Sequence, residues 1–317
     1  MQVKNLFYIG MPHHEIHQRF YKNVLGGEYL HHNSNTYDTK FDLLIKQDGP
    51  NVIWFFPNIY PDLHPHLKGK QVFIGHGLGF KPWLMEFRAV ALRNYFTQIW
   101  GVGNLQDIQL LEAGIPKAKI LPIGYTLPFL LPHIEIKPNS VLFSFVEWED
   151  FGEFENLIKI LSNLDPAIDA YVTVHPSLEK EKLIIVTKTI EAKGNITLLK
   201  TQDELMQATS FCSVIVGSSS SVLTPFFYLN KPVIYIRGRL GRNLFRGWGT
   251  IKKKIGNSLF NQILDESSKL STWKTFNLQF MKNSRVAPSA SKIFYPSNFS
   301  EADTIELIKN AYGMLLS

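Results

Sequence analysis

Four consecutive serines, Ser218 to Ser221, are the residues of this 317-residue chain that most directly suggest chemistry. They lie between two short apolar runs, Cys212–Val216 and Pro232–Ile236, which are typical of buried parallel strands. We expect a helix to begin in the serine run, where serine is a favoured N-cap, and to end near Asn230. The backbone N–H groups and hydroxyls of such a turn suit a phosphate group. The alternative is that the serines only cap the helix and turn the chain.

Two histidines also follow predicted strands. The strand Gln71–Ile74 leads into the turn Gly75-His76-Gly77, where the glycines permit close backbone approach and leave room for a substrate beside the imidazole. His175 directly follows a second predicted strand. A histidine near its ordinary pKa can accept a proton from a hydroxyl group or stabilise negative charge. The alternatives are a loop histidine bonded to backbone at position 76 and a strand-end histidine at position 175.

We therefore expect a site built from turns at the ends of several strands. His76 and His175 are the predicted catalytic residues. Binding of a phosphate-bearing donor substrate is assigned to the serine turn and the acidic turn at 147–152, with the residues Gly217, Ser218, Ser219, Ser220, Ser221 and Glu149. Binding of the second substrate, the acceptor, is assigned to Gly75, Gly77, Lys81, Arg239 and Arg242.

The positive charge of the chain is concentrated in one segment. The net charge is +6, and it is accounted for by seven basic residues that no acid interrupts: Arg237, Arg239, Arg242, Arg246, Lys252, Lys253 and Lys254. Such a patch indicates an anionic partner, either an anionic glycan or lipid-linked acceptor or the acidic surface of a membrane, unless it is simply a solvated basic face. Nucleic acid is not indicated, because no known binding module accompanies the charges.

The composition predicts a folded protein without a membrane span. No apolar run approaches the roughly 18 residues that a spanning helix needs. The first ten residues, with Lys4 and Gly10, predict a strand rather than an export signal. We expect a cytoplasmic protein, with the inner face of the membrane as an alternative location. Cys212 is the single cysteine, which excludes an intramolecular disulfide framework.

Apolar strands alternate with amphipathic helices along most of the chain. Strands are predicted at 3–9, 41–45, 52–56, 71–74, 98–102, 119–123, 141–146, 170–174, 196–199, 212–216 and 232–236. This pattern is typical of an α/β protein with two Rossmann-like βα domains that face each other across a cleft, the GT-B arrangement.

A segment with three prolines separates the two halves. We predict an acceptor-binding domain at 1–127, a linker at 128–139 and a nucleotide-donor-binding domain at 140–317. The last helix, 301–316, either completes the second domain or packs back on the first. Between 237 and 299 the sequence shows no clear period, and no elements are predicted there.

Several other chemistries are excluded by spacing. The pattern His14-Glu15 has Gln18 where a zinc-protease helix needs its second histidine, and neither glycine-rich turn completes a dinucleotide fingerprint, because Phe80 and Gln106 stand at the last glycine position. The serine turn lacks the second glycine of a hydrolase nucleophile elbow. No Asp-x-Asp pair of a metal-dependent GT-A transferase occurs. No dedicated metal site and no cofactor beyond a donor nucleotide are therefore predicted, although a divalent metal is not excluded.

The segment Gln71–Ile236 resembles the CDP-glycerol glycerophosphotransferases, which build teichoic acids and related capsule polymers. The resemblance is carried, in order, by Gly75-His76-Gly77 with Lys81-Pro82, by 99–126, by His175-Pro176, and by the serine pair that leads to Leu229-Asn230-Lys231-Pro232. It implies a GT-B fold, CDP-glycerol as donor and His76 as catalytic residue. It also implies that His175 and the serines contact the phosphates of the donor.

A second resemblance keeps the donor open. The acidic turn, His175-Pro176 and the serine run are also similar, in that order, to motifs of bacterial sialyltransferases. Both families use a cytidine nucleotide. We therefore expect a transferase that moves a polyol phosphate from a CDP-linked donor to a glycan or lipid-linked hydroxyl. The alternatives are a GT-B transferase that uses a CMP-sugar of the sialic acid or Kdo type, and a non-catalytic GT-B protein that binds a nucleotide or glycan.

Overall fold

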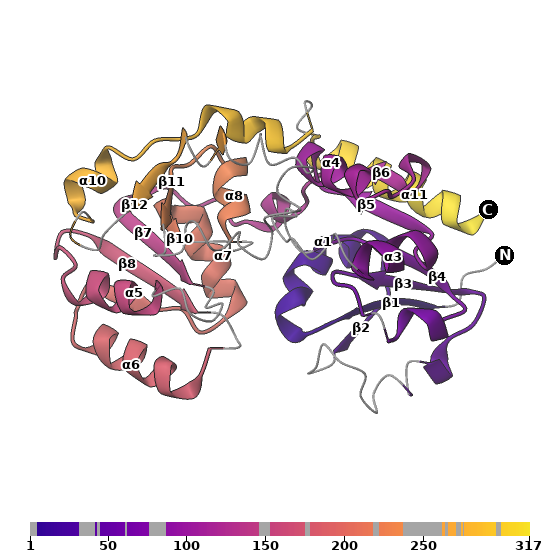
Figure 1. Ribbon diagram of the computed structural model, residues 1–317, viewed down its shortest axis with the longest axis horizontal. Helices are drawn as coiled ribbons and strands as arrows, with labels where there is room; N and C mark the ends of the chain where they lie inside the picture. The colour runs from indigo at the N-terminus through magenta and orange to yellow at the C-terminus, as the bar shows by residue number, and fades with distance from the viewer. Residues whose placement is uncertain are drawn as a thin grey trace. The chain divides into compact units, whose positions relative to one another are not determined.

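The protein is described here by a computed structural model, which covers residues 5–31, 42, 45–60, 62–75, 87–145, 153–174, 178–217, 222–236, 262–263, 266–270, 274, 276–295 and 299–317. The chain divides into two compact units (Figure 1). Unit 1 consists of Met1–Phe129 and Lys292–Ser317, and unit 2 is Leu130–Ser291. The chain therefore leaves unit 1 once and returns to it near its end.

Unit 1 contains a parallel sheet of six strands in the order β2-β1-β3-β4-β5-β6. Its strands are β1 (Asn5–Gly10), β2 (Glu28–His31), β3 (Val52–Phe56), β4 (Lys70–Phe73), β5 (Gln98–Gly101) and β6 (Ile120–Pro122). Its α-helices are α1 (Glu15–Leu25), α3 (Phe87–Asn94), α4 (Asn104–Glu112) and α11 (Glu301–Leu316). Short 3-10 helices are η1 (Pro12–His14), η2 (His64–His66), η4 (Lys117–Lys119) and η5 (Leu127–Leu130).

Every residue of β3 is buried, and its aromatic side chains pack on both faces of this sheet. On one face Trp54 and Phe56 pack with Leu92 of α3 and Leu110 of α4. On the other face Phe55 lies 5.3 Å from Trp100, ring centre to ring centre. A continuous apolar run of this kind is what a parallel strand covered on both faces requires.

The last helix belongs to unit 1. Helix α11 begins at a capping box in which the Ser300 hydroxyl accepts from the Asp303 N–H at 3.1 Å. It contacts α1, and near its C-terminal end the Lys70 ammonium donates to the Leu315 carbonyl. Gln98 Nε2 donates to the Ala311 carbonyl at 3.2 Å. Both donors come from neighbouring strands, so the sheet itself holds this helix in place.

Unit 2 contains a second parallel sheet of six strands, in the order β12-β11-β10-β7-β8-β9. Its strands are β7 (Lys137–Phe145), β8 (Asp169–Val174), β9 (Ile196–Leu198), β10 (Cys212–Gly217), β11 (Val233–Ile236) and β12 (Ser268–Leu270). Its α-helices are α5 (Glu153–Ser162), α6 (Lys180–Glu191), α7 (Gln202–Phe211), α8 (Leu223–Tyr228) and α10 (Leu278–Lys282), and the 3-10 helix η8 (Pro288–Ile293) leads back to unit 1.

The helices of unit 2 cover both faces of its sheet. Helices α5 and α6 contact each other on one face, and α7 and α8 contact the strands from the other face (Figure 1). The side chains of Phe143, Val172 and Val216 belong to one buried cluster with Leu161 of α5 and Val186 of α6. This is the doubly wound arrangement that right-handed βαβ connections produce.

The pairing of β7 with β10 contains a register shift near the amino ends of the two strands. Cys212 pairs with Lys137, whereas Val214 pairs with Val141, so β7 gains two residues over β10. The extra residues include Asn139, whose φ of 56° lies in the left-handed region that asparagine tolerates. Because the shift is by two residues, each side chain keeps its face of the sheet.

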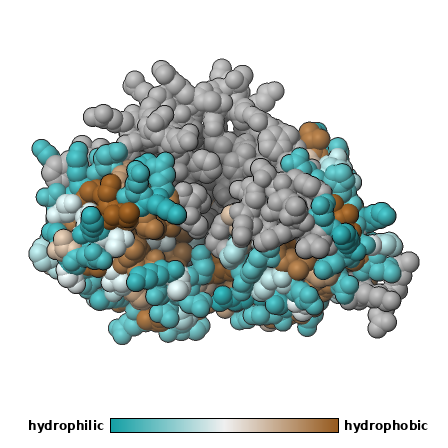
Figure 2. Space-filling view, turned by 90° about the horizontal axis from the view of Figure 1, so that it is seen from below, coloured by the Kyte–Doolittle hydropathy of each residue, from teal (hydrophilic) through white to brown (hydrophobic). Residues whose placement is uncertain are grey.

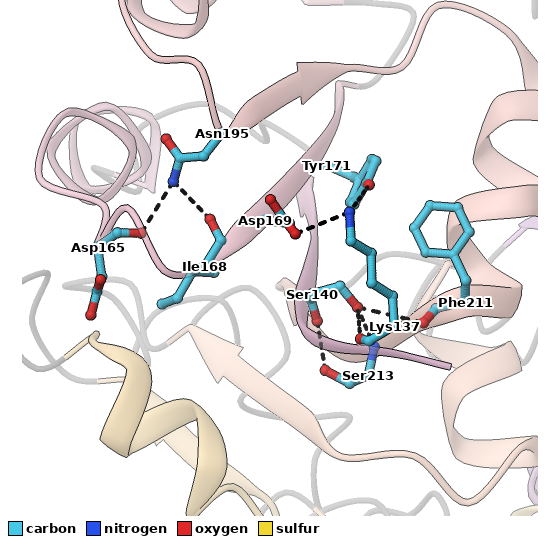
Figure 3. Close-up of polar contacts among 9 residues, drawn as sticks. All are labelled: Lys137, Ser140, Asp165, Ile168, Asp169, Tyr171, Asn195, Phe211 and Ser213. Carbon is cyan, nitrogen blue, oxygen red and sulfur yellow. Dashed lines mark hydrogen bonds and ion pairs between the residues drawn. The ribbon is translucent and has the colours of Figure 1, made fainter. Parts of the chain in front are cut away.

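Hydrogen bonds at the amino ends of the strands hold this shift (Figure 3). Ser140 Oγ accepts from the Ser213 N–H at 3.0 Å, and the Ser213 hydroxyl donates to the Ser140 carbonyl at 2.7 Å. Beside them the Lys137 ammonium lies 3.0 Å from an Asp169 carboxylate oxygen. The serine pair is buried or half-buried, so it is shielded from competing water.

Most predicted elements are confirmed within a few residues, and four differ. The strand expected at 41–45 is wrong, because Asp42 and residues 45–47 are helical. Strand β2 was not predicted, and β12 lies in the region where no element was predicted. Strand β7 starts at Lys137, inside the segment expected as a linker, because its first residues pair with β10.

His64 is a structural residue of unit 1. It is fully buried, its Nδ1–H donates to Gln71 Oε1 at 2.7 Å, and its Nε2 accepts from the Tyr60 N–H at 2.9 Å. The rings of Phe56 and Phe96 lie against it. Burial lowers the pKa of His64 to about 4, with the hydrogen bond to Gln71 acting in the opposite direction. The folded protein therefore holds a neutral imidazole at this position.

Lys231 is a buried cation in unit 2. Its ammonium donates to the carbonyls of Thr209 and Cys212 at 3.0 Å each, and also to the Ser210 carbonyl. Two of these carbonyls belong to the last turn of α7, where a positive charge is favoured. Desolvation lowers the pKa of Lys231. This lysine, part of the segment that suggested a family resemblance, therefore joins α7 to the start of β10.

The surface of the described residues is mostly hydrophilic in the view of Figure 2, with apolar side chains visible in groups. Large apolar side chains that are more than a third exposed are Val90, Tyr95, Ile108, Leu111, Ile134, Ile136, Leu183, Ile184, Ile185, Leu229 and Met314. Among the helices of the described residues, none has the length and apolar character needed to cross a membrane.

The first prediction concerns acid stability. Between pH 6.5 and 4 the unfolded chain protonates His64 and the folded chain does not. The contribution of neutral His64 to the free energy of unfolding is therefore fully present above pH 6.5 and is lost as the pH falls towards 4. The loss from this residue should be about 3 kcal/mol. In urea unfolding at several pH values, His64→Gln should be less stable at pH 7 but lose less stability on acidification. The exposed His66→Gln is the matched control, and an unchanged slope in His64→Gln would contradict the prediction.

The second prediction concerns Lys231. Replacement by methionine keeps the apolar stem but leaves three carbonyl oxygens without their donor, so Lys231→Met should lower the free energy of unfolding by about 3 kcal/mol. The exposed Lys188→Met should change it by less than about 0.5 kcal/mol. Urea unfolding of both variants checks this expectation. A Lys231→Met protein of normal stability would show that the ammonium is not a structural tie.

Candidate functional site

The strand order of unit 2 creates a single topological switch point. Strands β7, β8 and β9 follow one another in one direction across the sheet, and β10, β11 and β12 follow in the other direction, starting on the opposite side of β7. In open parallel sheets, ligands bind outside the carboxyl ends of the strands where this order reverses. The carboxyl ends of β7 and β10 are therefore the candidate binding edge of unit 2.

Gly217 lies at this edge and has no space for a side chain. It is the last residue of β10 and pairs with Ser144 of β7. A Cβ atom at position 217 would lie 2.8 Å from the Ser144 carbonyl oxygen and 3.1 Å from Leu223 Cδ2. Close approach, rather than unusual φ, is why glycine is needed here.

Three predicted turns start from neighbouring strands at this edge. The serine run follows Gly217 of β10, the acidic turn with Glu149 follows β7, and His175 follows Val174 of β8. Phe145 pairs with Val174 and Ser144 pairs with both Gly217 and Thr173, so the residues that precede the turns are adjacent. Ser218 to Ser221, Glu149 and His175 themselves lie outside the described residues, and their roles stay predictions.

Helix α8 begins later than the serine pattern predicted. Its N-cap is Val222, which contributes no side-chain hydrogen bond, and its first residue is Leu223. Since α8 begins at Leu223, two residues after the serine run ends, the expected helix start inside the run is wrong. The expected end near Asn230 is confirmed, since Asn230 takes a left-handed φ of 54° just before Lys231. A phosphate site here would depend on the serine turn and not on a long helix.

In unit 1 the candidate site begins at Gly75. Gly75 has a φ of 63°, which favours glycine, and it follows β4. A Cβ atom at this position would lie 3.2 Å from Nε2 of Gln106 in α4. His76, Gly77 and Lys81, together with Arg239 and Arg242 of the basic segment, lie outside the described residues.

Sequence reasoning missed a carboxylate near the carboxyl end of β5 in unit 1. Asp107, in the first turn of α4, accepts from the Tyr295 hydroxyl at 2.9 Å. Burial raises the pKa of Asp107 to about 6, although the hydrogen bond from Tyr295 acts to lower it. The signal in the sequence was Gly101-Val102-Gly103, since a Cβ atom at Gly101 would lie 2.5 Å from Asp107 Oδ1 and one at Gly103 would lie 2.5 Å from the Ile293 carbonyl oxygen. These glycines allow close packing and do not form a nucleotide-binding turn.

No group of three or more histidine, cysteine, aspartate or glutamate side chains is placed to hold a metal ion within the part of the chain that the structure describes. Cys212 is buried, and burial raises the pKa of its thiol to about 12. A thiol of this kind is not a nucleophile at neutral pH.

The chain matches no protein-family model, and none of the curated proteins compared with it matches. Solved structures do resemble it over nearly its whole length. MnaA from S. aureus, solved with UDP, aligns with a TM-score of 0.65 and 13% identity over 99% of this chain and 98% of the other. A putative UDP-N-acetylglucosamine 2-epimerase from Listeria monocytogenes gives 0.66 and 10%, over 100% and 97%.

A third similar structure is a variant of the wall teichoic acid polymerase TagF, solved after soaking with CDPG. It aligns with a TM-score of 0.58 and 9% identity, over 100% of this chain and 90% of the other. Identities this low identify the fold alone. Together with the two parallel six-stranded sheets and their covering helices, these similarities confirm that the chain has the GT-B type of fold, with two Rossmann-like domains.

Proposed function

We propose that this protein is a transferase that moves a polyol phosphate, of the glycerol phosphate type, from a CDP-linked donor to a hydroxyl group of a glycan or lipid-linked acceptor in cell-surface polymer synthesis. The observation that carries the proposal is the switch point of unit 2. There the close contact of Gly217 with Ser144 brings the strand that precedes the serine run beside the strand that precedes the acidic turn. A run of four hydroxyls at the carboxyl end of two parallel strands suits the diphosphate of a nucleotide donor.

Nucleotides in similar structures support this assignment. One neighbour was solved with UDP, and another, a wall teichoic acid polymerase, was soaked with CDPG. The order of motifs that resembles the CDP-glycerol glycerophosphotransferases adds the choice of cytidine. We therefore assign the donor to unit 2 and the acceptor to unit 1.

The proposed reaction is an in-line phosphoryl transfer. His76 accepts the proton of the acceptor hydroxyl, and the acceptor oxygen forms a bond to the phosphorus atom that carries the polyol. The bond from this phosphorus to the bridging oxygen of the diphosphate breaks, and CMP leaves with the electron pair. In such reactions the protein acts mainly by positioning and by stabilising charge, which is the role proposed for the serine N–H groups, their hydroxyls and protonated His175.

A second candidate keeps the cytidine nucleotide but changes the bond that breaks. The acidic turn, His175 and the serine run start from three adjacent strands, which suits a CMP-sugar donor of the sialic acid or Kdo type equally well. In that case the acceptor oxygen attacks the anomeric carbon and CMP is again released. The basic residues around Arg239 and Arg242 would favour an anionic acceptor in both cases, and they are consistent with peripheral contact with an acidic membrane.

The third prediction tests the nucleotide. CMP and CDP should raise the melting temperature more than UDP and GDP at equal concentration, because a ligand that binds only the folded state stabilises it in proportion to its affinity. The double change Ser219→Ala and Ser220→Ala should reduce this shift, whereas Ser162→Ala, an exposed serine at the end of α5, should not. A larger shift with UDP or GDP would overturn the assignment of cytidine.

The fourth prediction tests the base. His76→Ala should lower the rate of CMP release with CDP-glycerol and a lipid-linked or glycan acceptor by at least on the order of 100-fold, as expected for loss of a general base. Its CMP-induced thermal shift should stay close to that of the wild type, because the donor is assigned to unit 2. The exposed His66→Ala is the control. Wild-type transfer by His76→Ala would exclude this residue as the base, and CMP binding without turnover by the wild type would favour a non-catalytic binding protein.

A further inference from the structure

The segment by which the chain re-enters unit 1 packs on the loop between β5 and α4. Asn104 Nδ2 donates to the Phe294 carbonyl at 2.9 Å, and the Ile293 carbonyl lies against Gly103. The ring of Phe294 also packs near Tyr125, with 5.8 Å between ring centres. Residues 293–295 are thus held at the carboxyl end of β5 by backbone, polar and aromatic contacts.

Asp107 and Tyr295 join this segment to the first turn of α4 by a hydrogen bond between side chains. The Tyr295 hydroxyl donates to Asp107 Oδ2 at 2.9 Å, and the two groups meet over Gly101, where even a methyl side chain would collide with both. Among the described residues, the other carboxylate oxygen, Oδ1, is buried without a hydrogen-bond partner. Asp107 is half-buried, and a buried oxygen without a donor carries a cost in free energy.

Helix α4 connects this pair to Gly75, at the end of the described part of the segment that follows β4. Gln106 precedes Asp107 in the first turn of α4, and its Oε1 accepts from the Val102 N–H at 2.9 Å. Its Nε2 lies against Gly75, at 3.2 Å from the position where a Cβ atom would be. Gln106 is almost fully buried, so a movement of the first turn of α4 would be transmitted to Gly75.

We propose that Asp107 and Tyr295 are positioning residues for Gly75 and, through its peptide bond to the next residue, for His76. The hydrogen bond between them, which we call the edge latch, fixes the first turn of α4, and Gln106 transmits that constraint to Gly75. The inference depends on the proposed function only in so far as His76 is the base. The edge latch touches no reacting atom in this scheme, and it acts by limiting where the backbone of Gly75 can lie.

The fifth prediction tests the edge latch without substrate. Tyr295→Phe removes only the hydroxyl, and amide hydrogen exchange should become faster in peptides that cover 71–82 and 102–108, with residues 52–56 of β3 unchanged. Tyr312→Phe, which removes a hydroxyl from α11 in the same unit, is the matched control. Equal exchange in wild type and Tyr295→Phe, or an equal increase throughout unit 1, would overturn the proposal.

The kinetic arm separates positioning from general stability. Tyr295→Phe should lower kcat on the order of 10-fold and change KM for the cytidine donor by less than about twofold, because a displaced base slows the reaction without altering donor binding. Asp107→Asn keeps an acceptor oxygen for Tyr295 and should lose less than Asp107→Leu. Equal losses in these two variants, or a Tyr295→Phe protein with normal kcat, would count against the edge latch.

Failure of the proposed function has a different signature. If the wild type releases no CMP from any cytidine donor, the transferase assignment fails, while the exchange measurement still decides whether the edge latch holds Gly75. If Tyr295→Phe does not fold, the comparison of Asp107→Asn with Asp107→Leu by hydrogen exchange takes its place, and equal exchange at 71–82 in both would overturn the proposal.

Discussion

The pairing of β7 with β10 is the contact on which the candidate donor site depends. These two strands are neighbours in the sheet but far apart in the sequence, and the chain changes direction across the sheet between them. A parallel sheet of this order has one place where helices on the two faces diverge beyond the strand ends, and that place is set by this pair. The register shift held by Ser140 and Ser213 determines which residues of the two strands pair at their carboxyl ends, and it pairs Gly217 with Ser144.

Buried polar side chains in both units bind backbone groups instead of opposing charges. His64 accepts from a backbone N–H, and Lys231 donates to two carbonyls in the last turn of α7 and to one at the start of β10. Such contacts remove the penalty of an unsatisfied buried group while tying together segments that ordinary strand pairing does not join. They also explain why some residues of types common in active sites have a structural role here. Lys231 lies in a segment that resembles a transferase motif, and its side chain serves the fold.

Glycine has different roles at the two candidate edges. Gly75 takes a backbone conformation that other residues avoid, whereas Gly101, Gly103 and Gly217 keep ordinary or extended conformations and are needed for close approach. The pair Gly101 and Gly103 resembles half of a nucleotide fingerprint in spacing, yet it receives Tyr295 and Ile293 of the returning chain. Close packing of a distant segment can therefore require the same residue type at the same spacing as a phosphate-binding turn.

The sequence alone determined the fold class and most of the strands, because a buried parallel strand must be an apolar run and its covering helix must be amphipathic. It also placed Gly217 and Gly75 at strand ends. Short or irregular elements such as β2, β12 and the helical residues near Asp42 did not follow, since a few residues carry no readable period. Only the tertiary structure decided that Lys231 is structural, that α8 starts at Leu223, and that Asp107 meets Tyr295 across 188 residues of chain. Local patterns report which face of an element is buried, whereas contacts between distant segments depend on how the chain crosses between units and returns.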